Sequence, residues 1–159
     1  MASALRKPLV INGGQIEQLQ AGDILDAPVS DATVLQETNG SGSPITQGQA
    51  VYFNAADSVE LAEANAIGTV PCKGLVYATS IAAGSPGAII MEGLITLADW
   101  SSIIGSANLT ANVPYYLSPS TAGKLTATAP STVGQYVQEI GFALDTTTMF
   151  VKPKSTILL

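Results

Sequence analysis

The sequence contains no histidine and only one cysteine, Cys72. Without histidine, the Ser-His-Asp and Cys-His arrangements of nucleophilic catalysis are excluded. A single cysteine excludes a disulfide within the chain, and it leaves zinc without the sulfur and nitrogen ligands that its sites use. We therefore expect no metal and no cofactor, and we interpret Cys72 as a buried thiol.

Charged side chains are also scarce, at 11% of residues against roughly 25% in an average soluble protein. The net charge is −6, and four of the six basic residues lie near the two ends of the chain: Arg6, Lys7, Lys152 and Lys154. Nucleic acids and anionic membranes both attract clustered basic residues, so we expect neither as a partner. A surface poor in charge is typical of proteins that bury it against their own copies or in a larger assembly.

Long hydrophobic runs are absent. The longest apolar stretch, residues 88–97, is interrupted by Glu92 and Gly93 and is too short to span a bilayer. Between Pro8 and Asn12 only three apolar residues follow the basic pair, which does not fit a signal peptide. We therefore expect the chain to be made in the cytoplasm.

Paired carboxylates are the one type of catalytic group that the composition leaves open, as in glycoside hydrolysis. The local candidates are Asp23 with Asp26, and Asp57 with Glu60 and Glu63. Carboxylates at this spacing are more often turn and surface residues than a catalytic pair facing across a cleft. We predict that the chain is not an enzyme and that it has no catalytic residues.

The last two thirds of the sequence contain an internal repeat with a spacing of ~65 residues, which is typical of a duplicated structural unit. The aligned segments are residues 45–53 with 109–117, 74–79 with 141–146, and 88–91 with 149–151. Each segment has the short, apolar, glycine-bounded character of a β-strand. The repeat therefore predicts a mainly β fold.

We expect a β-sandwich or barrel built from a duplicated β module. Its two repeats are residues 45–97 and 109–159, and residues 98–108 connect them. Within the connector, Asp99 and Gly105 have the character of residues that begin and end a helical turn. For residues 59–66 helix and strand are both possible, and the strand-like second copy favours strand.

Residues 1–44 are predicted to form an extended N-terminal arm and linker, because they are too few to hold a core of their own. The arm contains short strand candidates at residues 9–11 and 33–36, and the glycine- and serine-rich residues 39–44 are expected to be flexible. Apolar arm residues are candidates for contact with a partner or a neighbouring copy: Leu9, Val10, Ile11, Ile16 and Leu19.

The aromatic residues of the body are core anchors or a recognition platform. Of the adjacent pair Tyr115 and Tyr116, a strand would bury one and expose the other. Trp100 lies in the irregular connector, and tryptophan is enriched in interface centres. We therefore predict Trp100, Tyr115 and Tyr116 as interface residues of the body.

Three segments, residues 113–117, 123–126 and 140–144, together with the leader 7–19, resemble capsid decoration (cement) and head-fibre proteins of tailed bacteriophages. The resemblance covers most of the chain and depends mainly on β-turn chemistry. It implies a virion structural protein on the capsid exterior that is synthesised in the host cytoplasm and stabilises the assembled head.

The resemblance also implies that the partner is the major capsid protein, and we predict that the chain assembles with itself as a homotrimer. Two alternatives stay open. The chain could be a tail-fibre or tail adaptor protein of the virion, or a carbohydrate-binding module that uses exposed tyrosines.

Overall fold

The structure, a computed structural model, describes residues 32–159 in full and the strand backbone of residues 9–12 and 15–18. It is mainly β, as predicted. Strands β1 (Leu9–Asn12) and β2 (Gln15–Gln18) pair antiparallel, so the predicted strand at residues 9–11 is confirmed. Leu19 lies outside the described residues, as do the side chains of Leu9, Val10, Ile11 and Ile16.

A barrel-like sheet forms the first half of the described body, residues 32–92. Its strands are β3 (Thr33–Asn39), β5 (Ala50–Ala55), β6 (Ser58–Leu61), β7 (Gly74–Val76) and the first part of β9 (Pro86–Thr96). The order β9-β3-β6-β5-β7 closes on itself, because β7 also pairs with β9. The closure has one parallel contact, between β3 and β6, and the short strands β4 (Ile45–Thr46) and β8 (Ser80–Ile81) pair beside it.

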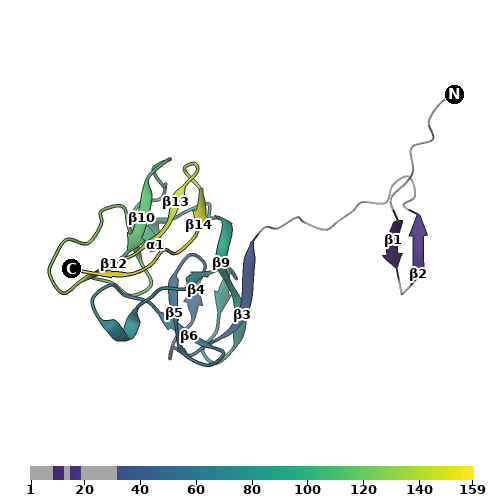
Figure 1. The fold of residues 1–159 in the computed structure, drawn as a ribbon, viewed down its shortest axis with the longest axis horizontal. Helices are drawn as coiled ribbons and strands as arrows, with labels where there is room; N and C mark the ends of the chain where they lie inside the picture. The colour runs from purple at the N-terminus through teal and green to yellow at the C-terminus, as the bar shows by residue number, and fades with distance from the viewer. Residues whose placement is uncertain (1–8, 13–14, 19–31) are drawn as a thin grey trace.

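The second half, residues 93–159, is a sheet that continues from the end of β9 (Figure 1). Its strands are β10 (Pro114–Leu117), β11 (Leu125–Thr126), β13 (Glu139–Ala143) and β14 (Thr148–Val151), in the order β9-β14-β13-β10-β11. Strands β12 (Tyr136–Val137) and β15 (Ile157–Leu158) form a separate ribbon.

Gly93 marks the point where β9 passes from the barrel to the second sheet. Its φ of 129° is unfavourable for residues with a side chain, and a Cβ there would lie 2.7 Å from Ala32. The glycine therefore allows one strand to belong to both halves.

The connector is a short helix, as predicted. Helix α1 spans Ser101–Ile104, and Asp99 Oδ1 accepts a hydrogen bond from the Ser101 amide at 2.8 Å. Gly105 ends it in the left-handed region, with its amide donating to the Ser101 carbonyl. A 3-10 turn, η1 (Ile67–Thr69), is the other helical element of the described residues. None of the helices in this part of the chain has the length and hydropathy to cross a membrane.

The predicted flexible linker at residues 39–44 is instead a hydrogen-bonded turn of the barrel. Asn39 is fully buried, and its Nδ2 donates to the carbonyls of Ser43 and Ile81, both at 2.9 Å. Its Oδ1 accepts from the Ser41 amide. The arm boundary predicted at residue 44 is also displaced, since β3 pairs with β9 along its length. Glycine and serine here satisfy the geometry of a turn.

Buried side chains form two clusters. The smaller fills the barrel and consists of Ile45, Val51, Val59, Val76, Ile81 and Ile89. The larger contains residues of both halves, among them Leu75 and Ile90 of the barrel and Leu117 and Met149 of the second sheet. The two halves therefore share one core.

Pairing in the two halves follows the same order and register. Strands β5, β7 and β9 are consecutive neighbours, as are β10, β13 and β14. The matching Cα partners are Ala50–Leu75 with Pro114–Phe142, Val51–Gly74 with Tyr115–Gly141, and Leu75–Ile90 with Phe142–Phe150.

The turns that precede β5 and β10 also match. Gly48 has a φ of 85° and donates its amide hydrogen to the Val76 carbonyl at 2.9 Å. Asn112, at the aligned position, has a φ of 62° and donates to the Ala143 carbonyl at 2.8 Å. Asparagine tolerates this backbone region better than most residues with a side chain.

Candidate interaction surfaces

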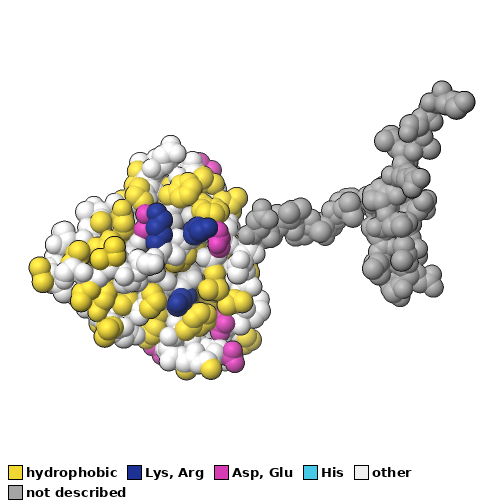
Figure 2. Space-filling view, in the orientation of Figure 1, with side chains coloured by type: hydrophobic (Ala, Val, Ile, Leu, Met, Phe, Trp, Pro, Cys, Tyr) yellow, Lys and Arg dark blue, Asp and Glu magenta, His cyan; other side chains and the backbone are white. Residues whose placement is uncertain are grey.

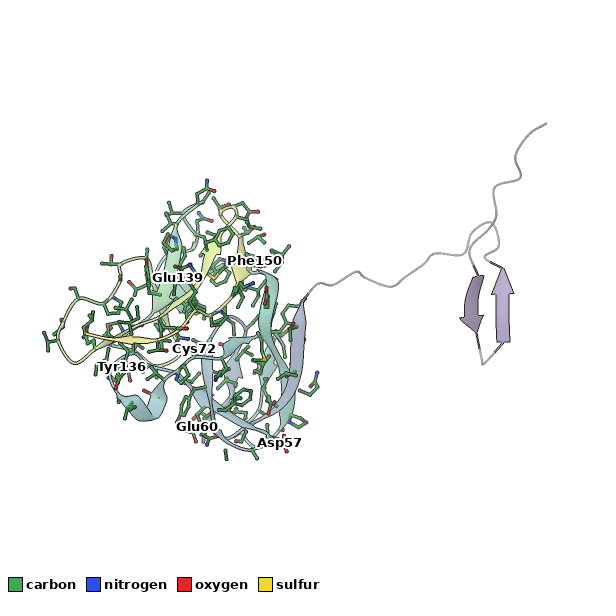
Figure 3. The ribbon with its side chains drawn as sticks, in the orientation of Figure 1. Asp57, Glu60, Cys72, Tyr136, Glu139 and Phe150 are labelled. Atoms are coloured by element: carbon green, nitrogen blue, oxygen red, sulfur yellow. The ribbon has the colours of Figure 1, made fainter. Side chains whose placement is uncertain are left out.

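Two of the carboxylates considered for chemistry lie away from the single cysteine. Figure 3 shows Asp57 and Glu60 at the lower end of the barrel and Cys72 in the middle of the body. Glu60 accepts hydrogen bonds from Tyr52 at 3.1 Å and Asn54 at 2.7 Å, its neighbours on the same hairpin. Asp57 occupies the turn of that hairpin with a φ of 57°. Asp57 and Glu60 therefore lie on one hairpin, where hydrogen bonds from the neighbouring strand hold the Glu60 carboxylate.

Cys72 is buried, as predicted, and burial raises the pKa of its thiol from 9.0 to about 12. Its Sγ donates to the Gly74 carbonyl at 3.3 Å. A thiol with such a pKa forms almost no thiolate near neutral pH, so it is a poor nucleophile. Among the described residues, no group of three or more His, Cys, Asp or Glu side chains could hold a metal ion.

An open cavity of about 620 Å³ lies beside Cys72, where β9 meets the segment that follows β14. Gln138 lies in its wall and is itself 1% exposed. Its Oε1 accepts from the Cys72 amide at 2.8 Å, and its Nε2 donates to the carbonyls of Cys72 and Lys154, both at 2.9 Å. Both polar atoms of Gln138 are therefore engaged in holding backbone segments together.

A row of apolar side chains crosses the outer face of the second sheet. Pro114, Phe142, Phe150 and Leu94 are successive Cα partners on β10, β13, β14 and β9. Residues directly opposite on neighbouring strands share a face, so these four form a continuous row, which we call the outer row. Phe142 is 40% exposed and Leu94 51%, and the two phenylalanine rings lie 5.7 Å apart.

Uncharged and charge-balanced groups flank the outer row. On one side the Thr96 and Thr148 hydroxyls lie 3.1 Å apart. On the other, Lys152 pairs with Glu92 at 2.7 Å, and further along Lys154 pairs with Glu139 at 2.8 Å. Figure 2 shows basic and acidic side chains next to hydrophobic ones on the upper part of the body. Exposed ion pairs add little stability, but within each of these two pairs the charges cancel.

A second apolar surface is the ribbon of β12 and β15. The Gly134 amide donates to the Leu159 carbonyl, and the Leu159 amide donates to the Gln135 carbonyl, both at 3.0 Å. Val133 is 88% exposed, and Ile157 and Leu158 are also exposed. Together with the outer row, this ribbon gives the body two apolar surfaces.

The aromatic residues predicted for the interface lie mostly in the core. The prediction for Trp100 is wrong: it is fully buried, and its Nε1 donates to the Thr147 carbonyl at 2.8 Å. An irregular connector does not expose its tryptophan when the connector packs into the core. Tyr115 is buried too, and its hydroxyl accepts from the Thr110 amide at 3.0 Å. Tyr116 is half-buried, so one tyrosine faces inward and one outward, as expected.

Sequence reasoning missed Phe142, Phe150 and Leu94 as surface residues. The available signal was the strand alternation along residues 148–151, but a row exists only once the register of four strands is known. No family model matches the chain, and no curated protein matches it. The chemistry of the described surfaces is that of binding through apolar contact and exposed backbone.

Proposed function

We propose that this chain is a structural protein of a tailed-phage virion, of the decoration or head-fibre type, which binds the assembled head and stabilises it. The observation that carries the proposal is the pair of exposed apolar surfaces on the β body of a chain that is only 11% charged. Contiguous apolar surface on a soluble protein marks a site of interaction. The resemblance of residues 113–117, 123–126 and 140–144 supports a place on the virion.

The proposed partner is the major capsid protein, and the proposed location is the capsid exterior. A protein that binds only the assembled lattice stabilises that lattice by mass action, whatever the chemistry of each contact. Such a role requires rigidity and binding surfaces and no catalytic group. Assembly as a homotrimer belongs to the same proposal.

Attachment is proposed to occur through the N-terminal residues. Among the described residues, β1 pairs only with β2, so one edge of each strand is free to pair with an edge on the capsid protein. Backbone pairing of this kind provides affinity without charged side chains, which suits the composition of the chain.

We also infer that the two halves of the body are copies of one module. The support is the matched register of β5, β7 and β9 with β10, β13 and β14, and the matched turns at Gly48 and Asn112. Independent folds would have no reason to share both the sequence spacing and the hydrogen bonds.

The test is co-sedimentation of the purified full chain with bare phage heads. We expect the full chain to sediment with heads, and a chain lacking residues 1–20 to stay in the supernatant while keeping the β-type circular dichroism of the body. Undiminished binding by the shortened chain would reject the role of the N-terminal residues. A full chain that binds no head would reject the proposed function itself.

The tail-adaptor alternative is separated from head decoration by copy number and position. Electron microscopy of labelled protein on particles would place a decoration protein at many sites over the head. A tail adaptor would instead give a few copies at one vertex.

A further inference from the structure

The outer row of the second half has an equivalent in the first half. Successive Cα partners on β5, β7, β9 and β3 are Ala50, Leu75, Ile90 and Val34. Position for position they match Pro114, Phe142, Phe150 and Leu94 on β10, β13, β14 and β9. The fourth strand is matched as well. In the second half the fourth strand is β9, which pairs with β14, and in the first half it is β3, which pairs with β9.

The two rows differ in burial. Ala50, Leu75 and Ile90 are fully buried, in one cluster with Leu117, Ile140 and Val151 of the second half. These three positions of the first-half row are therefore covered in the core that the second sheet shares, whereas the fourth, Val34, is 37% exposed. The outer row is apolar in the same way, yet Phe142 and Leu94 remain 40% and 51% exposed.

We propose that the outer row is a docking surface for a second copy of this chain. In the first half, the buried residues of the equivalent row pack against the apolar face of the second sheet. The chemistry of the outer row thus favours a flat, apolar β surface as its occupant. The outer rows of neighbouring copies around the three-fold axis of the proposed homotrimer are such surfaces.

Charge supports a second copy as the occupant. The chain carries a net charge of −6, so two copies repel one another over most of their surfaces. At this face, however, two acids have basic partners: Glu92 pairs with Lys152 and Glu139 with Lys154. Two copies that meet here bring neutral ion pairs together in place of unpaired acids. Thr96 and Thr148, on the other side of the row, carry no charge.

This inference does not depend on binding to phage heads, because it concerns the isolated chain. The experiment is sedimentation velocity of the full chain over a range of concentrations. We expect the wild-type protein to be heavier than the 16.2 kDa chain. Leu94→Lys places a charge in the row and is expected to weaken assembly at least about ten-fold. Ile67→Lys, at a position 79% exposed on η1, is the matched control and should assemble as the wild type does.

A second measurement identifies what covers the row. In Leu94→Cys the new thiol is exposed, whereas the native Cys72 is buried and does not compete for a thiol reagent. If a second copy covers the row, labelling slows as protein concentration rises. Labelling that is independent of concentration, a wild-type mass of one chain at every concentration, or full assembly of a folded Leu94→Lys variant would each overturn the proposal. Faster labelling at every concentration after removal of residues 1–20 would identify the chain's own N-terminal part as the occupant and overturn it too.

Discussion

Gln138 connects backbone groups that are far apart in the sequence. Its side-chain amide bonds both backbone groups of Cys72 in the first half and the carbonyl of Lys154 beyond β14. A backbone amide and carbonyl in the interior need such partners, since an unpaired buried polar group is costly. One glutamine thereby joins the two halves at the cavity wall.

Replacing Gln138 with leucine keeps its approximate size and removes all three hydrogen bonds. We expect Gln138→Leu to lower the free energy of unfolding by about 3 kcal/mol, because the Cys72 amide is left buried without a partner. Urea denaturation followed by circular dichroism measures the change. Gln36→Leu, at an exposed position of β3, is the control and should change stability by less than about 0.5 kcal/mol. Equal effects of the two substitutions would contradict this role for Gln138.

Some roles of single residues follow from sequence and others do not. The burial of Cys72 and the opposite orientations of Tyr115 and Tyr116 were predictable, because they depend on residue type and strand alternation. The burial of Trp100 and the bonds of Gln138 were not, because they depend on which segments the fold brings beside them. The interface role expected for Trp100 failed for that reason.

At the scale of elements, glycine permits close approach of neighbouring strands in both halves. A Cβ on Gly74 would lie inside 3.0 Å of the Ile90 carbonyl oxygen in β9. A Cβ on Gly141 would lie equally close to the Phe150 carbonyl oxygen in β14. The two glycines are aligned in the repeat, so the same constraint acts at equivalent places.

We expect Gly74→Ala and Gly141→Ala to lower the free energy of unfolding by similar amounts, about 2 kcal/mol or more, since backbone atoms must move to admit the methyl group. Gly42→Ala is the matched control: no atom lies within 4 Å of its Cβ position, so we expect a change of less than about 0.5 kcal/mol. Chemical denaturation of the three variants under one condition provides the comparison. A neutral Gly141→Ala beside a damaging Gly74→Ala would weaken the argument for equivalent halves.

Strands were the most predictable elements. Residues 51–53, 75–77 and 88–91 fall in or beside β5, β7 and β9, because apolar β-branched residues between turns favour strands strongly. The glycine- and serine-rich turn at 39–44 was mistaken for a linker, since composition does not reveal the buried Asn39 that holds it. The outer row was not predictable either. It consists of residues 94, 114, 142 and 150, which are far apart in the sequence and come together only through the pairing of four strands.

At the scale of the whole molecule, the larger core cluster joins the two halves. It contains Leu75 and Ile90 from the barrel together with Leu117, Met149 and Val151 from the second sheet. Strand β9 adds a backbone connection, because it is hydrogen-bonded in both sheets. Neither half can therefore lose its structure without exposing apolar surface of the other.

This shared core predicts one cooperative unfolding transition. Trp100 is the single tryptophan, is buried in the connector and bonds Thr147, so its fluorescence reports on the second half. Circular dichroism reports on all strands, and we expect the two signals to give the same urea midpoint. Leu75→Ala in the barrel should lower the midpoint of both signals together, with a loss of about 2–5 kcal/mol.

Met149→Ala is the reciprocal variant, since it truncates a buried side chain of the same cluster in the second sheet. It should lower the urea midpoints of the fluorescence and circular dichroism signals together, as Leu75→Ala does, because both side chains belong to one core. If Leu75→Ala shifts the dichroism and leaves the Trp100 transition in place, the halves unfold separately. The larger cluster would then be a contact between two independent units, and the role of β9 as a strand common to both would have to be abandoned.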